Sequence, residues 1–249
     1  MKKLVTLVSI LTIGLSTFAQ EETTTNKPLR FGIKASPTLS WLKAKSNDLE
    51  GDGSSLGFSY GLMADFSIGD NYAFSTGLDV SHKGGKLAYT DKKGQFLNPI
   101  TLAYTDSTLN TNQAYFKNAD YSIQHLEIPL TIKMHTKEIG YLTYYAQAGV
   151  APSITIGAKY NKIRYREKDD TLLYEDTDAN AITDINTFGL AMIVGAGIEY
   201  SISGDTKIMM GVTFNNGFTD ILDQNKKEYK DYNEKASANF IALNIGVFF

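Results

Sequence analysis

The last fourteen residues of the chain, 236–249, carry an alternating pattern of side chains. Large apolar residues occupy every second position, namely Ile241, Leu243, Ile245, Val247 and Phe249. Small or polar residues stand between them, including Ala242, Asn244 and Gly246. A period of two predicts a β-strand whose two faces differ in polarity. One continuous apolar face on such a strand suits contact with a hydrocarbon phase.

The same alternation predicts seven further strands, over 30–41, 56–68, 71–83, 121–134, 141–156, 186–202 and 206–215. A soluble β-sandwich also shows alternating strands, so the pattern alone does not choose between two environments. The apolar faces run almost unbroken over about ten residues. This is the length with which a tilted strand crosses a bilayer.

The connections between these strands alternate in length. Three are short, at 69–70, 135–140 and 203–205, and four are long, at 42–55, 84–120, 157–185 and 219–235. Short turns on one side and long loops on the other are typical of outer-membrane barrels. We therefore expect an all-β fold: an eight-stranded antiparallel transmembrane β-barrel of up-and-down topology. The long loops are expected to face outward, with both termini on the short-turn side.

Three prolines, Pro37, Pro129 and Pro152, fall inside predicted strands. Proline removes a hydrogen-bond donor from the strand ladder. We expect bulges or strand offsets at these positions.

The start of the chain predicts export. Residues 1–3 form a short basic start, and residues 4–18 are mostly apolar. Thr17, Phe18 and Ala19 then fit a small-x-small cleavage site. We expect a signal peptide at 1–19, a polar leader at 20–29 and the barrel domain at 30–249. The alternative, a membrane anchor helix, is disfavoured because the apolar run is shorter than the roughly 20 residues that span a bilayer.

Composition narrows the function further. The chain has no cysteine, which excludes disulfides, thiolate metal sites and cysteine nucleophiles. The net charge of −3 argues against nucleic acid as a partner. Aromatic residues are plentiful, with 15 tyrosines and 13 phenylalanines, as interfacial girdles require. We expect no cofactor and no metal.

The alternation places a set of charged residues inside the barrel. The set comprises Arg30, Lys34, Asp65, Asp79, Lys83, Glu127, Lys133, Glu199 and Lys207. An eight-stranded barrel is just wide enough for side chains to fill it, so buried charges must pair or keep water. The hypothesis is a salt-bridge plug. A narrow ion path is the alternative.

Small barrels can act on lipids, and the sequence contains one candidate catalytic set. His125 and Glu127 share the inward face of strand 121–134, and Ser81 could lie across the barrel from them. This would form a Ser-His-acid set. No nucleophile elbow, zinc-binding histidine pair or phosphate loop occurs in the sequence, so we expect no catalytic residue.

Three segments resemble one known family. They are His125-Leu126-Glu127-Ile128-Pro129-Leu130-Thr131-Ile132-Lys133, Tyr145-Ala146-Gln147-Ala148-Gly149-Val150-Ala151-Pro152-Ser153 and Gly195-Ala196-Gly197-Ile198-Glu199-Tyr200. They are similar to strands of the PorT-like outer-membrane barrels, also called porin-family proteins. His125 departs from the aromatic residue usual in that family. The resemblance implies an outer-membrane barrel and no catalytic residue. The family's namesake takes part in type IX secretion, a role that the motifs do not carry over.

These observations predict a non-enzymatic barrel in the outer membrane of a Gram-negative cell, with a plugged lumen and exposed loops. Its expected role is structural or in interaction, or as an accessory to an envelope complex such as one for secretion. The expected partners are outer-membrane lipid, the barrel-assembly machinery during insertion, and an envelope protein bound through the long loops. The alternatives are a narrow channel or transporter for small solutes and a lipid-modifying enzyme.

Overall fold

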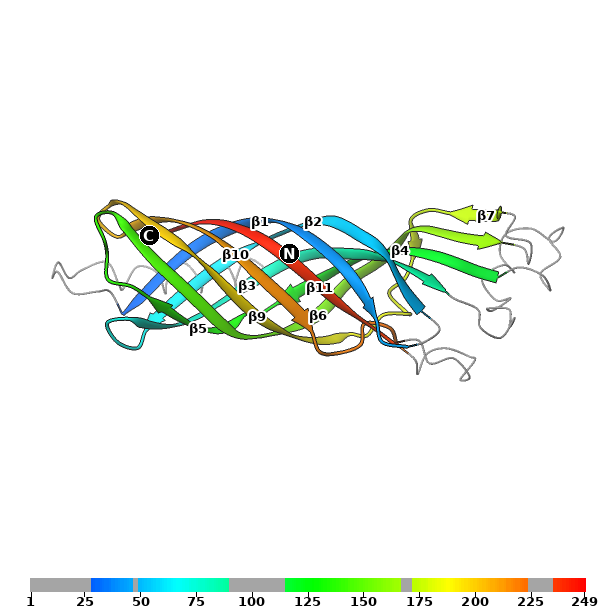
Figure 1. Cartoon of the computed structure of the whole chain (residues 1–249), viewed down its shortest axis with the longest axis horizontal. Coiled ribbons are helices and arrows are strands. Elements are labelled where there is room, and N and C mark those ends of the chain that lie inside the picture. The colour runs from blue at the N-terminus through cyan, green and yellow to red at the C-terminus, as the bar shows by residue number, and fades with distance from the viewer. Residues whose placement is uncertain (1–27, 47–48, 90–114, 167–171, 224–234) are drawn as a thin grey trace, which may run out of the picture.

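The computed structural model describes residues 28–46, 49–89, 115–166, 172–223 and 235–249 (Figure 1). The strands of this part of the chain are β1 (Leu29–Ala44), β2 (Leu49–Ser67), β3 (Tyr72–Tyr89), β4 (Tyr115–Glu127), β5 (Leu130–His135), β6 (Leu142–Arg166), β7 (Leu172–Asp176), β8 (Ala179–Asn180), β9 (Phe188–Ser203), β10 (Thr206–Gly217) and β11 (Ala236–Phe248). All their pairings are antiparallel.

Eight strand positions form a ring. β4 and β5 share one position because both pair with β3 on one side and with β6 on the other. Each position pairs with those before and after it in the chain, and β1 pairs with β11 to close the ring. This is the connectivity expected from the alternating strands. Figure 1 shows the strands wound obliquely about the long axis of the molecule.

The short connections gather at one end of the ring, on the left in Figure 1. They join β2 to β3, β5 to β6 and β9 to β10. Gly140 and Gly204 adopt positive φ angles of 67° and 56° in two of these turns. Glycine reaches this region without a steric penalty, which explains its place in both turns.

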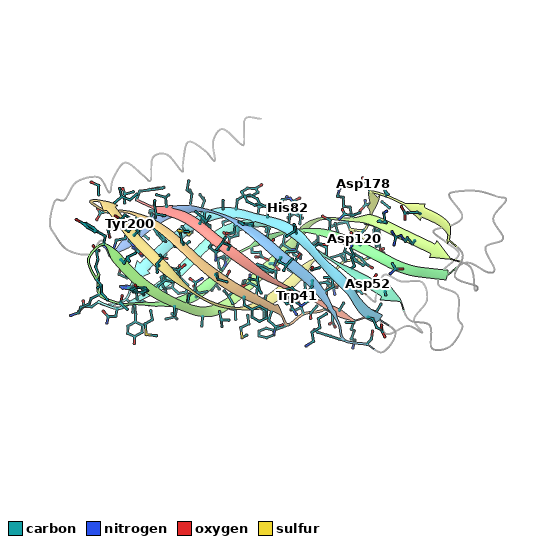
Figure 2. All side chains as sticks on the ribbon, turned by 45° about the horizontal axis from the view of Figure 1, so that its top comes forward. Trp41, Asp52, His82, Asp120, Asp178 and Tyr200 are labelled. Atoms are coloured by element: carbon teal, nitrogen blue, oxygen red, sulfur yellow. The ribbon has the colours of Figure 1, made fainter. Side chains whose placement is uncertain are left out.

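The outward face of the ring is apolar. On β11, Ile241, Leu243, Ile245 and Phe249 are 42%, 46%, 45% and 58% exposed, and Val247 is half-buried. Between them, Ala242 and Asn244 are buried. Aromatic pairs flank this apolar band: Trp41 stacks on Phe214 towards one end, and Tyr141 lies against Tyr200 at the other. Figure 2 shows Trp41 and Tyr200 well separated along the ring.

The strands extend further than the alternation predicts. β2 begins at Leu49, β3 runs to Tyr89 and β6 runs to Arg166. The predicted loop 157–185 therefore contains the last part of β6 together with β7 and β8. The backbone hydrogen bonds of a sheet do not depend on alternation of side chains, so the ladder continues where the sequence pattern stops. β4, β6 and β7 project beyond the rest of the ring (Figure 1), and we call this sheet, with the adjoining ends of β2 and β3, the outer extension.

The expectation of offsets at the prolines is wrong. Pro37 pairs with Phe58 and Pro152 with Leu190 without a register shift. Pro129 separates β4 from β5, yet the ladder to β6 keeps one register on both sides of the break. The Ile128 amide donates to the Pro152 carbonyl at 3.0 Å, which bridges the interruption. The bulges of this ladder lie further out, where β4 and β6 enter the outer extension.

Within the described residues, no helix is long and apolar enough to cross a membrane. The predicted signal peptide, 1–19, and most of the predicted polar leader, 20–29, lie outside those residues.

A charge on the outward face tests its contact with lipid. Ile245 lies near the middle of the apolar row on β11, so Ile245→Arg is expected to lower the free energy of unfolding by about 2–4 kcal/mol in lipid vesicles. The control, Ile139→Arg, places the same charge at an exposed residue of a short turn. It should cost no more than about 1 kcal/mol. Urea titration measures both, and equal costs would contradict a lipid-facing β11.

Candidate functional site

Four charged residues from four strands meet inside the ring near its short-turn end. Arg30 of β1 contacts Asp65 of β2 at 2.9 Å and Glu199 of β9 at 2.8 Å. Lys133 of β5 contacts the same two carboxylates at 2.7 and 3.2 Å. Lys133, Asp65 and Glu199 are almost fully buried. Each cation therefore bridges both acids, and the four side chains tie together strands that are not neighbours in the ring.

Aromatic rings pack against this inner charge cluster. The Lys133 ammonium lies 4.8 Å from the centres of the Tyr145 and Phe248 rings, and the Arg30 guanidinium lies 4.6 Å from Phe248. Cation–π contact stabilises a charge that has left water. The Tyr145 ring needs the glycines opposite it, because a Cβ at Gly197 or Gly211 would collide with its hydroxyl.

Phe248 and Phe240 are interior residues that the sequence analysis does not name. Both stand at inward positions of the closing strand, and both are buried. The alternation that assigns Val247 and Phe249 outward assigns Phe248 inward, so the signal was present.

A second set of ion pairs lies further along the interior. Lys34 contacts Asp79 at 2.7 Å, and Lys83 forms a buried ion pair with Glu127. The Lys83 ammonium lies 4.1 Å from the centre of the Phe240 ring. Lys34, Asp79 and Glu127 also line a cavity of about 60 Å³ that reaches Lys133 of the inner charge cluster. This volume has room for a small number of water molecules.

The two sets of ion pairs balance in charge. Four cations, Arg30, Lys34, Lys83 and Lys133, face four carboxylates, Asp65, Asp79, Glu127 and Glu199. Lys207 is not one of them, since it contacts Glu138 at 3.3 Å at the short-turn end. The ion pairs thus need no bound counter-ion. The described residues also contain no group of histidines and acids that could hold a metal.

Apolar side chains fill the interior beyond the second set of ion pairs. Members from β1 to β4 are Leu42, Leu49, Leu87, Ala119, Tyr121 and Ile123; later members are Tyr160, Ala181, Ile185, Ile221, Leu222 and Ala236. We call this cluster the outer seal. The Asn186 side chain reinforces it by donating to the Asp220 and Leu222 carbonyls at 2.9 and 3.0 Å. The outer seal thus places buried apolar side chains across the interior at this end.

The candidate catalytic residues take a different arrangement from the one expected. Ser81 does not lie across the barrel from His125 but is its register partner on the neighbouring strand. Glu127 forms an ion pair with Lys83. Ser81 and His125 are buried, and neither the Ser81 hydroxyl nor His125 Nδ1 has a hydrogen-bond partner among the described residues. They lie between the outer seal and the Lys83–Glu127 ion pair.

Comparison with known proteins defines the family. The family model described as outer membrane protein beta-barrel domain matches residues 18–223. This chain belongs to that family. The predicted PorT-like group is a finer assignment that this match does not make. No curated protein sequence matches the chain.

Several solved structures are similar to the chain in fold. Neisserial surface protein A is 12% identical, with a TM-score of 0.42, and the match covers 88% of this chain and 95% of that chain. OprG from Pseudomonas aeruginosa is 9% identical, with a TM-score of 0.41 and coverage of 88% and 95%. The outer membrane protease OmpT from Escherichia coli is 10% identical, with a TM-score of 0.48 and coverage of 92% and 99%.

The outer extension of this outer-membrane barrel carries exposed charges. Glu175 of β7 accepts from Lys162 and Arg164 of β6 at 2.8 and 2.9 Å. Hydrogen bonds from Lys162 and Arg164 lower the pKa of the Glu175 carboxyl. Lys159 contacts Asp178 at 2.6 Å. These pairs are solvated, so they orient side chains at the surface and add little stability.

Removing the Lys133 ammonium tests how much the inner charge cluster contributes to stability. Lys133→Met leaves two buried carboxylates to one guanidinium, and we expect unfolding free energy to fall by about 3–5 kcal/mol. Lys159→Met, which breaks a solvated pair, should cost no more than about 1 kcal/mol. Urea titration in vesicles measures both variants. A Lys133→Met protein as stable as Lys159→Met would show that the cluster is dispensable for stability.

Proposed function

We propose that this protein is a closed, non-enzymatic barrel that anchors the outer extension at the cell surface for interaction with another envelope component. One observation carries the proposal: the interior is occupied over its length by paired charges, aromatic rings and the outer seal, while the sheet continues beyond it. A barrel blocked in this way offers solutes no path. Its exposed sheet is then the part available to partners.

The proposed orientation follows from the two ends of the ring. One end has only short turns, and the other has the outer extension with its charged side chains. Outer-membrane barrels carry short periplasmic turns and long extracellular loops. The family assignment supports residence in the outer membrane. The outer extension accordingly faces the outside.

The two rival functions lack a path to their sites. A narrow channel requires a continuous polar route, and the outer seal interrupts it with buried apolar side chains. A lipid-modifying enzyme requires its nucleophile to reach lipid, and Ser81 is fully buried inside the ring. The four-to-four charge balance further supports a plug, because an ion path gains from unpaired charge along its walls.

We also propose the PorT-like group within the family. Support comes from the three motif segments, which lie side by side in the ring. The segment at 125–133 spans β4 and β5, which pair with the β6 segment at 145–153. β6 in turn pairs with the β9 segment at 195–200. The shared motifs thus describe one continuous wall, and a role in an envelope complex fits that group.

Export by the predicted signal peptide is part of the proposal. Cleavage after Ala19 would leave Gln20 as the first residue of the mature chain, shortly before β1 begins at Leu29. The apolar run and the cleavage site support this boundary. β1 would then begin on the periplasmic side, next to the short turns.

Single-channel recording tests the closed interior. The purified barrel, inserted in a planar bilayer, is expected to give no conductance steps, because the outer seal excludes hydrated ions. A Lys133→Met barrel should also be silent, since the outer seal is remote from that residue. A sixteen-stranded porin serves as the positive control for insertion and recording. Reproducible steps from the native barrel would overturn the closed reading.

Site-specific photo-crosslinking tests the interaction role. A photoreactive residue at exposed Asn161 on the outer extension is expected to give a cross-linked adduct in intact cells. The same residue at exposed Lys137, in a short turn, serves as the matched control and should not give that adduct. Immunoblotting detects both. Failure at Asn161, or an identical adduct from both positions, would contradict an interaction through the outer extension.

A further inference from the structure

The outer extension contains a pocket on its outward face. The pocket has a volume of about 210 Å³ and is lined by Asp52, Lys86, Asn118, Asp120, Lys162 and Arg164, besides Ala119. These residues come from β2, β3, β4 and β6, so four adjacent strands build one concavity. Figure 2 shows Asp52 and Asp120 together on this side of the molecule, beyond Trp41.

Two opposite charges face each other in this pocket without pairing. Lys86 and Asp120 are register partners on β3 and β4. No ion pair joins them, and Asp120 Oδ1 is buried with no hydrogen-bond partner among the described residues. A buried carboxylate oxygen without a donor is costly. Among the described residues, the pocket thus offers the Lys86 ammonium and the Asp120 Oδ1 atom to a ligand that carries both charges.

The other polar groups are held in place by their own contacts. Glu175 holds Lys162 and Arg164 at 2.8 and 2.9 Å. Asn118 donates to Asp52 at 2.5 Å, which orients that carboxylate. Three cations and two carboxylates therefore line one cavity, and contacts hold three of these five groups, Lys162, Arg164 and Asp52. Charge-assisted hydrogen bonds from several cations are a strong way to bind a phosphate.

The pocket lies directly above the apolar band. On the β2–β3 ladder, Phe58 pairs with His82 within the band, and Gly53 pairs with Lys86 in the pocket. Leu56 stands between these two pairs and is 88% exposed. Gly53 lies three residues beyond Leu56 on β2, which is about 10 Å along the strand and about 7 Å along the bilayer normal for a strand tilted by about 45°. At this height a barrel in a bilayer meets the lipid headgroups.

We propose that this pocket binds a phosphoethanolamine group of an outer-leaflet lipid. Lys86, with Lys162 and Arg164, donates hydrogen bonds to the phosphate, and Asp120 accepts hydrogen bonds from the ammonium group. The mixed charge of the lining favours this zwitterion over a purely anionic group. The group occurs in glycerophospholipids and as a substituent of outer-leaflet glycolipids. The inference rests on the proposed membrane insertion, because that insertion places the pocket at headgroup height.

Nuclear magnetic resonance titration tests the chemistry of the pocket. The labelled barrel is held in a maltoside detergent, which carries neither phosphate nor amine, and O-phosphorylethanolamine is added. We expect amide shifts centred on β3 and β4 around Lys86 and Asp120. Inorganic phosphate and ethanolamine, added separately, should each bind at least roughly tenfold more weakly, since each satisfies half of the charges. Phosphate binding of equal strength, or no shift with O-phosphorylethanolamine, would overturn the proposal.

Charge-removing variants assign the binding to the pocket. Asp120→Asn and Lys86→Gln should each weaken O-phosphorylethanolamine binding at least roughly tenfold, whereas Lys137→Gln at the opposite end should leave it unchanged. Heat-modifiable migration on a detergent gel checks that every variant is folded. Unchanged affinity in the folded pocket variants would overturn the assignment.

Native mass spectrometry of the barrel extracted from its own membranes identifies the source. A retained diacyl lipid with phosphoethanolamine, or a glycolipid bearing that group, supports the proposal and names the carrier. Retention of neither, or equal retention by Asp120→Asn, would overturn it. These assays read headgroup binding alone. If O-phosphorylethanolamine does not bind and the planar bilayer shows no conductance, only the pocket proposal fails. If the ligand binds selectively but the barrel conducts, only the proposal of a closed barrel fails.

Discussion

Pairing of β1 with β11 is the interaction on which the rest of this structure depends. A strand in hydrocarbon cannot leave its amides and carbonyls unpaired, so a membrane-spanning sheet must have no edge. The ladder from Gly32 and Phe248 to Ala44 and Ala236 supplies that closure. Once the ring is closed, side chains on one face contact lipid and those on the other are confined to a narrow interior. The packing and charge pairing of the interior follow from that confinement.

The interior of the ring is filled by side chains whose charges balance. An eight-stranded ring leaves little room, and each buried charge costs solvation free energy that only a close partner offsets. Lys133 and Arg30 each contact both Asp65 and Glu199, so these four charges are satisfied jointly. Aromatic rings fill the remaining space around the cations. Beyond the ion pairs, apolar side chains complete the block. Closure of the sheet is therefore accompanied by an interior filled with ion pairs, aromatic rings and apolar side chains.

The outer extension escapes both constraints. Its outward residues meet water and headgroups instead of hydrocarbon, so charges such as Lys159 and Asp178 can stand on its surface. Its backbone ladder still continues from the ring, which keeps β6 and β7 ordered above the membrane. The outer extension is therefore a polar sheet that is continuous with the ring. The unpaired Lys86 and Asp120 give that surface a defined chemistry at the height of the lipid headgroups.

The sequence by itself determined the number of ring positions, their order and the face of most side chains, because a period of two is a local property. It also determined the inward charges of the two clusters. The tertiary structure decided which charges pair, that Ser81 lies beside His125, and that Lys207 pairs with Glu138. Strand ends beyond the lipid were also decided there, since alternation fades where water replaces hydrocarbon. Neighbours across a ring depend on stagger and bulges, and these are set by the closed sheet as a whole.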